Sequence, residues 1–306
     1  MLWAVTSYFN PMGYARRLAN YRTFRRRLSV PLVTVEWAWA GGVGYQLDPG
    51  DADILIQLSS PDLMWQKERL LNVALRSLPD ECRYVAWLDC DLVFEDAEWP
   101  QRTIELLDRF PVLQMFEHAY DLEPDAPLDG DDRRVGSRLT AATHAEATGV
   151  TVPDLRRSSL RPAGFLTGLA WAARFDLLRR HGFYDACIMG SGNRALYSAI
   201  YGRLDDVMAY LRMKPRWQEH YLAWARPYYD DVRGRVGCVP GCIYHLWHGD
   251  IKLRRYAERH LGFEPFGFEP VSDLLVDAAG CFRWKADNPE MRRFVESYFA
   301  SRREDG

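Results

Sequence analysis

The sequence predicts an α/β fold in which a mainly parallel sheet is flanked by helices. Apolar runs of strand length alternate with segments of helical periodicity, in the order strand, helix, strand, strand, helix, strand, through Leu88. The chain has 306 residues, enough for a sizeable buried core, and its 48% hydrophobic and 26% charged residues are close to the average for soluble globular proteins. No linker and no internal repeat divides the sequence, so we expect one domain.

The first part of the chain supplies most of the expected sheet. Residues 2–9 form a strand that Asn10-Pro11 ends, because proline has no N–H to donate to a neighbouring strand. A helix with six arginines and no acidic residue is expected over residues 14–28, and a second helix with one apolar face over residues 64–78. The other strands are expected at residues 31–39, 53–59 and 84–88.

The later part begins with an expected strand at residues 110–122, followed by an acidic loop at residues 123–132. We expect that loop to be solvated, with a lid or acceptor-site loop as the alternative. Residues 164–182 predict a glycine-rich entry, an apolar strand and a helix that ends at Gly182. From Tyr244 onward, short apolar runs are mixed with basic helical segments, which predicts a helical elaboration.

The composition of the sequence argues against several classes of protein. A net charge of −3 argues against an extended surface for binding polyanions, although it leaves room for a local basic patch. Six cysteines are too sparse for a disulfide scaffold. Cys238 and Cys242 have the spacing of half a zinc site, but the only pair that follows is His245 and His248, which we assign to another role. Without a signal peptide or a long apolar run, a cytoplasmic protein is expected.

The stretch "YVAWLDCDLVFED" ends an apolar strand in two aspartates, Asp89 and Asp91. A second Asp-x-Asp occurs at Asp51 and Asp53, but it precedes a strand. In parallel sheets the ligand crevice lies outside the carboxyl ends of the strands, so only the first pair is expected to face it. Alternate residues point the same way, and Asp89 and Asp91 can therefore converge on one divalent cation, Mg²⁺ or Mn²⁺. Two solvated turn aspartates are the alternative.

Three segments carry a resemblance to a known family. "MWQKERLLNVALRSLPDECRYVAWLDCDLVF" resembles the segment that leads into the metal-binding DxD motif of GT-A (Rossmann-like) nucleotide-sugar glycosyltransferases, notably the galactosyltransferase type. "GFLTGLAWAARFDLLRRHGFYDACIMGSGN" resembles the acceptor-side segment of those families, and "HLWHGD" resembles their late histidine motif. Together the segments cover about half of the chain. The whole chain also resembles bacterial and phage glycosyltransferases.

The resemblance implies a metal-dependent glycosyltransferase that moves a sugar from a nucleoside diphosphate sugar, with a UDP-sugar favoured, to an acceptor hydroxyl. Charge develops on the leaving diphosphate, which metal and Lys or Arg must neutralise. The implied metal ligands are Asp89, Asp91 and a late histidine, with His248 favoured over His245 because it adjoins Gly249. Candidates for diphosphate contact are Lys67, Arg69 and Lys252, and Asp89 is also a candidate for nucleotide binding.

The ends of the first two strands lie where GT-A folds receive the base and ribose. The residues concerned are Thr6, Tyr8, Asn10 and Glu36. Glu36 could accept hydrogen bonds from ribose hydroxyls, with a solvated strand terminus as an equal alternative. The implied division is a nucleotide-sugar-binding half at 1–120, an acceptor and catalytic half at 121–250 and the C-terminal elaboration at 251–306.

The catalytic base is left open by the sequence. "MGSGN" places Asn193 where the resembled families usually carry an acidic residue, and an amide cannot act as a base. Three readings remain: another group such as Asp185 serves, the mechanism retains configuration, or the residue was substituted to trap substrates. Asn193 and Asp185 are therefore the two catalytic candidates.

Other functions share parts of this pattern. A nucleotidyltransferase also uses paired aspartates and a metal, but it is expected to carry a glycine-rich phosphate loop after the first strand, where "YFNPMGYARR" has one glycine. A catalytically silent nucleotide-sugar-binding module is supported by Asn193 alone. For the acceptor, a small-molecule or glycan hydroxyl is favoured. The alternative is a hydroxymethylated base in phage DNA, bound by the arginine-rich helix and flipped out.

Overall fold

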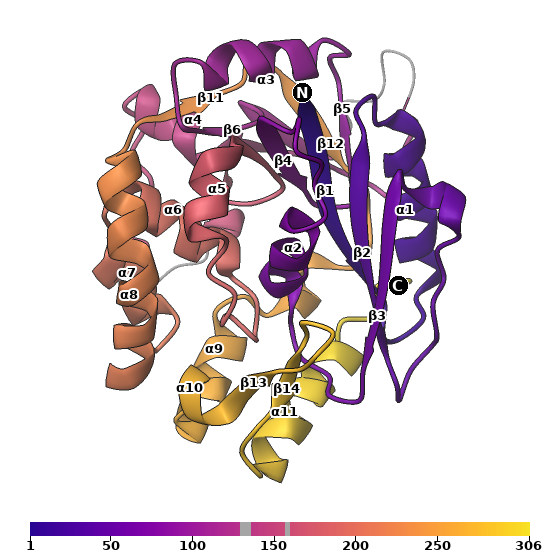
Figure 1. The fold of residues 1–306 in the computed structure, drawn as a ribbon, viewed down its shortest axis with the longest axis vertical. Coiled ribbons are helices and arrows are strands. Elements are labelled where there is room, and N and C mark those ends of the chain that lie inside the picture. The colour runs from indigo at the N-terminus through magenta and orange to yellow at the C-terminus, as the bar shows by residue number, and fades with distance from the viewer. Residues whose placement is uncertain (129–135, 157–159) are drawn as a thin grey trace.

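The computed structural model describes residues 1–128, 136–156 and 160–306. Its largest sheet has seven strands in the spatial order β11-β6-β10-β4-β1-β2-β3 (Figure 1). The strand β10 runs antiparallel to both of its neighbours, whereas the other pairs are parallel. The bounds are β1 (Leu2–Phe9), β2 (Leu32–Trp39), β3 (Ile54–Ser60), β4 (Tyr84–Leu88), β6 (Val112–Gln114), β10 (Ala170–Arg174) and β11 (Val236–Cys238). The predicted fold class, a mainly parallel α/β sheet flanked by helices, is confirmed.

Helices cover both faces of this sheet. The helices of the described residues are α1 (Ala15–Arg27), α2 (Lys67–Leu75), α3 (Trp99–Leu107), α4 (Ala142–Ala147), α5 (Phe175–His181), α6 (Gly192–Tyr201), α7 (Leu204–Tyr210), α8 (Pro215–Val232), α9 (Glu258–Phe263), α10 (Pro270–Asp273) and α11 (Pro289–Ala300). The expected helices at residues 14–28 and 64–78 are therefore present, the second shorter than expected at both ends.

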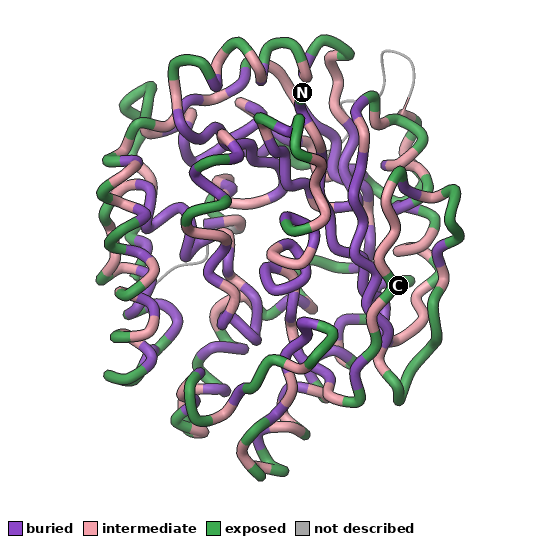
Figure 2. Tube along the Cα trace, viewed as in Figure 1, coloured by how far each residue is buried: buried purple, intermediate pink, exposed green. Residues whose placement is uncertain are grey.

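Alternation along the central strands divides the core into two layers. Val5 and Phe9 of β1 pack in the cluster that contains the apolar residues of α2, whereas Ala4 and Tyr8 pack with those of α1. Successive strand residues point to opposite faces, and here both faces are covered. This explains why β1, β2 and β4 read as continuous apolar runs and appear as buried strands at the centre of the molecule (Figure 2).

The turn after β4 leads from the first sheet into a second sheet. Its spatial order is β5-β12-β7-β8-β9, with β5 (Leu92–Phe94), β7 (His118–Leu122), β8 (Gly136–Ala141), β9 (Phe165–Leu166) and β12 (Cys242–His245). The prediction of a single strand at residues 110–122 was wrong. The segment is split into β6 and β7, because the chain passes into the second sheet at Glu117 and His118, whose N–H groups donate to the carbonyl of Gly241. Part of the acidic loop, residues 129–132, lies outside the described residues.

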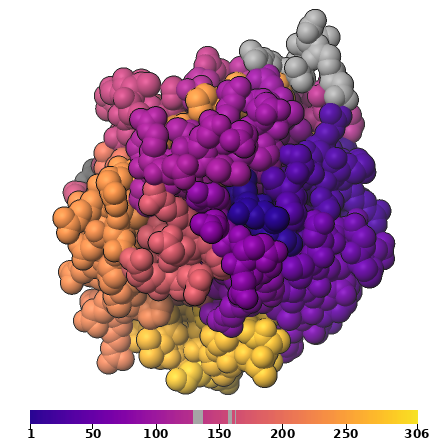
Figure 3. Space-filling model, turned by 45° about the horizontal axis from the view of Figure 1, so that its top comes forward, coloured from indigo at the N-terminus to yellow at the C-terminus, as the bar shows by residue number. Residues whose placement is uncertain are grey.

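Most of the C-terminal residues lie at the bottom of the molecule in the view of Figure 1. The expected helices of this region are joined by a hairpin of β13 (Leu274–Val276) and β14 (Phe282–Trp284). In the space-filling view this segment, coloured yellow, lies against both the purple N-terminal part and the orange region of α8 (Figure 3). The last residues return to α1, where the side chain of Asp305 accepts from the N–H groups of Ala15 and Arg16 at 3.0 and 2.8 Å.

Candidate active site

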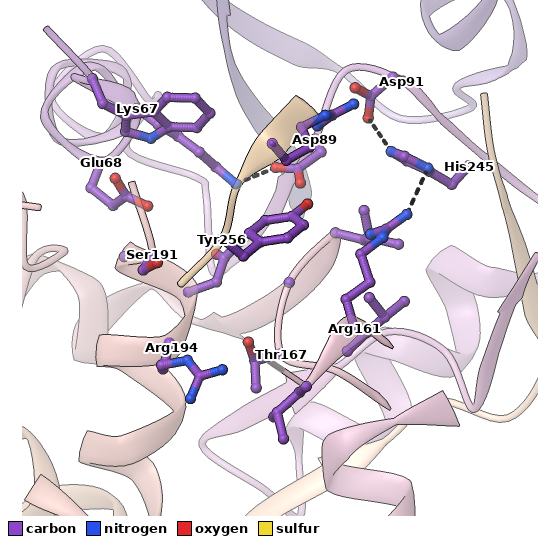
Figure 4. Close-up of a pocket in the computed structure, with 18 of the residues that line it drawn as sticks. Lys67, Glu68, Asp89, Asp91, Arg161, Thr167, Ser191, Arg194, His245 and Tyr256 are labelled. Atoms are coloured by element: carbon purple, nitrogen blue, oxygen red, sulfur yellow. Dashed lines mark hydrogen bonds and ion pairs between the residues drawn. The ribbon is translucent and has the colours of Figure 1, made fainter. Parts of the chain in front are cut away.

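A pocket of about 190 Å³ opens at the carboxyl ends of β1 and β4. Its walls come from the turn after β4, from residues 160–169, from the start of α6 and from the segment after β12 (Figure 4). The predicted position of the site, outside the carboxyl end of the strand that precedes Asp89, is where this pocket lies. The other Asp-x-Asp lies away from it, with Asp53 paired to Arg25 at 3.0 Å.

Three side chains form a compact cluster of metal-ligand type inside the pocket. One ligand atom from each of Asp91, His245 and His248 lies within 4.8 Å of the others. An Asp91 oxygen is 3.0 Å from Nε2 of His248, the other is 3.7 Å from Nε2 of His245, and the two Nε2 atoms are 3.3 Å apart. Within the described part of the chain, this is the only group of three or more such residues with this spacing.

A carboxylate faces the Nδ1 side of each imidazole. Asp121 lies 2.9 Å from Nδ1 of His245 and is also paired with Arg161. Glu304 lies 3.7 Å from Nδ1 of His248. At His245 such a carboxylate holds the ring and leaves the far nitrogen directed at a metal. At His248 the nearest group is Arg254, which lies 2.8 Å from Nδ1 and 2.9 Å from Nε2. The arrangement therefore resembles the outer ring of contacts around a metal site.

The electrostatics of the cluster suit a divalent cation. Burial alone would raise the pKa of Asp91, but His248, His245 and Arg17 lower it below its usual range. Burial and Arg254 lower the pKa of His248, which favours the neutral imidazole that a metal ligand requires. One buried oxygen of Asp91 has no hydrogen-bond partner among the described residues. The residues present thus fit a metal ion.

Asp89 occupies a different position from Asp91. Its carboxylate is paired with Lys67, which stands at the start of α2 (Figure 4). Burial opposes the charge on Lys67, but Asp89 and Glu68 outweigh it and raise the Lys67 pKa. The structure therefore brings Lys67 and Asp89 into the pocket as an ion pair, and it brings His245 as well as His248 to Asp91.

The predicted nucleotide-binding residues of the first two strands are buried, and their side chains form hydrogen bonds within the protein. The hydroxyl of Thr6 donates to the carbonyl of Leu88 at 2.6 Å. Tyr8 and Asn10 both donate to the side chain of Gln46 at 2.8 Å. Glu36 accepts from the N–H of Gln46 at 2.6 Å. None of these four predicted residues is among the described residues that line the pocket.

The remaining predicted residues are divided between the pocket and its surroundings. Asn193 lines the pocket at the first turn of α6. Asp185 does not line it and is held by Arg69 and Asn72, both at 3.0 Å. Arg69 thus forms an ion pair with Asp185 and does not line the pocket. Lys252 is exposed and outside the pocket.

Several pocket residues were not found from the sequence. Seven cationic and three acidic side chains of the described residues line it: Arg17, Lys67, Arg161, Arg194, Arg254, Arg259 and Arg302, against Glu68, Asp89 and Asp91. The arginines come from five distant segments, and no local spacing distinguishes them from surface arginines. Arg254 takes the place expected for Lys252, because the turn of residues 251–254 points it inward. Glu68 could have been recognised from the sequence, because it directly follows the predicted candidate Lys67.

Among known proteins, no family model and no curated protein matches the sequence. Among solved structures, a mycobacterial protein is similar with a TM-score of 0.41 and 13% identity, over 96% of this chain and 87% of that one. TarS 1-349 from S. aureus in complex with UDP-GlcNAc has a TM-score of 0.37 and 12% identity, over 81% and 59%.

A third similar structure is the 4-diphosphocytidyl-2C-methyl-D-erythritol synthase of Anaerococcus prevotii, with a TM-score of 0.35 and 10% identity over 98% of both chains. Because these TM-scores are below 0.5, the function proposed below depends on the site. In the described part of the chain, no helix is both long and apolar enough to cross a membrane.

Proposed function

We propose that this protein is a metal-dependent glycosyltransferase that moves a sugar from a nucleoside diphosphate sugar to an acceptor hydroxyl. The observation that carries the proposal is the Asp91, His245 and His248 cluster at the carboxyl end of β4, inside a pocket with an excess of cationic side chains. A donor of this kind brings a diphosphate, which needs both a cation and guanidinium or ammonium groups.

The metal would be held by Asp91, His245 and His248. Mn²⁺ is favoured over Mg²⁺, because Mg²⁺ is bound chiefly by oxygen ligands and this set includes two imidazoles. When bound, such an ion offsets the charge that develops on the leaving diphosphate. Lys67, held beside the cluster by Asp89, adds a positive charge that is already in position.

Three arginines behind the metal cluster add to the positive charge of the pocket. Arg17 and Arg302 pair with the buried Glu304, at 2.9 and 2.5 Å. Arg254 lies 2.8 Å from Nδ1 of His248. These contacts fix the guanidinium groups in place before a ligand arrives, so less conformational entropy is lost on binding. A UDP-sugar remains the favoured donor from the sequence resemblance.

A small-molecule or glycan hydroxyl remains the favoured acceptor. The arginine-rich helix α1 offers less free charge than the sequence implied, since Arg16 is paired with Asp125 at 2.7 Å, Arg17 with Glu304 and Arg25 with Asp53. A duplex would have to compete with these ion pairs. DNA carrying a hydroxymethylated base is therefore the second candidate acceptor.

A panel experiment separates the proposed function from its rivals. The protein is incubated with Mn²⁺ and either a nucleoside diphosphate sugar or a nucleoside triphosphate with a sugar phosphate. A glycosyltransferase releases nucleoside diphosphate from the first set, whereas a nucleotidyltransferase releases pyrophosphate from the second. Binding of a nucleotide sugar without release of either product would identify a silent binding module and would contradict the proposal.

A further inference from the structure

Sugar transfer to a hydroxyl releases a proton, and the pocket must contain a group that accepts it. Three carboxylates of the described residues line the pocket: Glu68, Asp89 and Asp91. Asp91 faces two histidines, and Asp89 is paired with Lys67. Asp185, a candidate from the sequence, is held outside the pocket lining by Arg69 and Asn72. Glu68 is the carboxylate that these contacts leave available.

Glu68 is directed at the turn that begins α6. The residue is 5% exposed, and its Oε2 atom is buried without a hydrogen-bond partner among the described residues. Its carboxyl group packs on Gly192, where an added Cβ would lie 2.1 Å from Cδ of Glu68. Figure 4 shows Glu68 between Lys67 and Ser191, at the edge of the cavity. A carboxylate in this position reaches the side of the pocket formed by Ser191, Gly192 and Asn193.

We propose that Glu68 is the base of the transfer reaction, an inference that rests on the glycosyltransferase function proposed above. An oxygen of Glu68 takes the proton of the attacking hydroxyl. The hydroxyl oxygen forms a bond to the anomeric carbon as the bond from that carbon to the diphosphate oxygen breaks, and the electron pair leaves with the diphosphate. Attack from the side opposite the diphosphate inverts the anomeric configuration.

The protonation behaviour of Glu68 agrees with this role. Burial raises its pKa to about 7, although Lys67 acts in the opposite direction. The charged groups that act on it are Lys67 on the same helix, Asp89 after β4 and Asp185 before α6. A base works best when its pKa lies near the operating pH. Only the ionised form accepts a proton, so the rate of transfer is expected to rise as the pH passes through about 7.

The test uses water and azide as acceptors, because neither requires that the natural acceptor be known. Water must lose a proton as it attacks, whereas azide carries none and needs no base. In Glu68→Gln, release of nucleoside diphosphate with water as the acceptor should fall by about 10²–10⁴. Sodium azide should restore the release and give a glycosyl azide of inverted configuration. Glu105→Gln, an exposed position of α3 outside the pocket lining, is the matched control and should keep the wild-type rate.

Each result decides a separate point. If the wild-type protein releases no nucleoside diphosphate from any nucleotide sugar, the glycosyltransferase function fails and Glu68 is not at issue. If the wild type is active and Glu68→Gln keeps more than a tenth of its rate, or azide does not restore the loss, Glu68 is not the base. Should Glu68→Gln fail to fold, the wild type decides: its rate with water should rise through pH 7 while its rate with azide stays flat, and two parallel profiles would overturn the proposal.

Discussion

An oxygen of Asp91 lies 3.0 Å from Nε2 of His248, although the two residues come from distant parts of the chain. The contact joins the turn after β4 to the segment after β12, because β12 and β5 pair as neighbours in the second sheet. The N–H of Leu246 also donates to the carbonyl of Asp91 at 2.8 Å. The second sheet therefore completes the site that the first sheet begins.

Asp121 is expected to tune the metal through His245. Replacing Asp121 by Asn removes the carboxylate 2.9 Å from Nδ1 of His245, and changes at such outer positions typically weaken metal affinity by about 10–100-fold. Titration calorimetry with Mn²⁺ measures this directly. Asp125→Asn, in the exposed loop after β7, should bind as the wild type does. Equal affinity in both variants would show that His245 is not a metal ligand.

Substitutions of Lys67 and Lys252 compare the effect of a positive charge in the pocket with that of a positive charge outside it. Lys67→Met should weaken binding of UDP in the presence of Mn²⁺ by about tenfold, since a hydrogen bond to a charged group contributes about 1.5–3 kcal/mol and part of this is offset by loss of the Asp89 pair. Lys252→Met should leave the affinity unchanged because that side chain is exposed and outside the pocket lining. The reverse order of effects would place the diphosphate elsewhere.

Gly192 tests the contact between α2 and α6. Alanine is favoured over glycine in a helix by about 1 kcal/mol, but its Cβ would lie 2.1 Å from Cδ of Glu68. Overpacking of this kind costs about 1–3 kcal/mol, so Gly192→Ala is expected to lower the free energy of unfolding by up to about 2 kcal/mol and to reduce turnover. Gly50→Ala, which meets nothing within 4 Å, is the control in urea denaturation. A stabilised, fully active Gly192→Ala protein would disprove the contact.

Glu304 is expected to be among the most sensitive positions for stability. It is 2% exposed and pairs with Arg17 and Arg302. Glu304→Gln leaves two guanidinium groups without their carboxylate, and breaking a buried ion pair costs about 3–5 kcal/mol. Chemical denaturation should show this loss. Asp305→Ala, which removes the side chain that caps α1 near the surface, should cost about 1 kcal/mol. Similar small losses in both would mean that the Glu304 network is hydrated and not buried.

The sequence was most informative where local pattern decides structure. The apolar runs of β1, β2 and β4 were recognised because both faces of these strands are covered, and the position of Asp91 followed from the end of β4. Residues 110–122 were misjudged because apolarity does not reveal where a chain changes from one sheet to another. Glu36 was a candidate for binding ribose, with a solvated strand terminus as the equal alternative, and its carboxylate accepts hydrogen bonds from the N–H of Gln46 and the side chain of Gln57.

The composition of the pocket could not be predicted for a related reason. Arg17, Arg254 and Arg302 meet there only through the packing of the C-terminal residues on α1 and β12. Each arginine looks ordinary in its own segment. The position of Glu68 likewise depends on a contact between α2 and α6, two helices that are distant in sequence.

Metal dependence of donor turnover tests the central claim most directly. Release of nucleoside diphosphate from the best nucleotide sugar is measured in wild type, in Asp91→Asn and in Asp51→Asn, which changes the other Asp-x-Asp. We expect EDTA to abolish release in the wild type and Mn²⁺ to restore it, Asp91→Asn to remain inactive at any Mn²⁺ concentration while staying folded, and Asp51→Asn to behave as the wild type. Undiminished release by the wild type in EDTA, or by Asp91→Asn, would contradict the account.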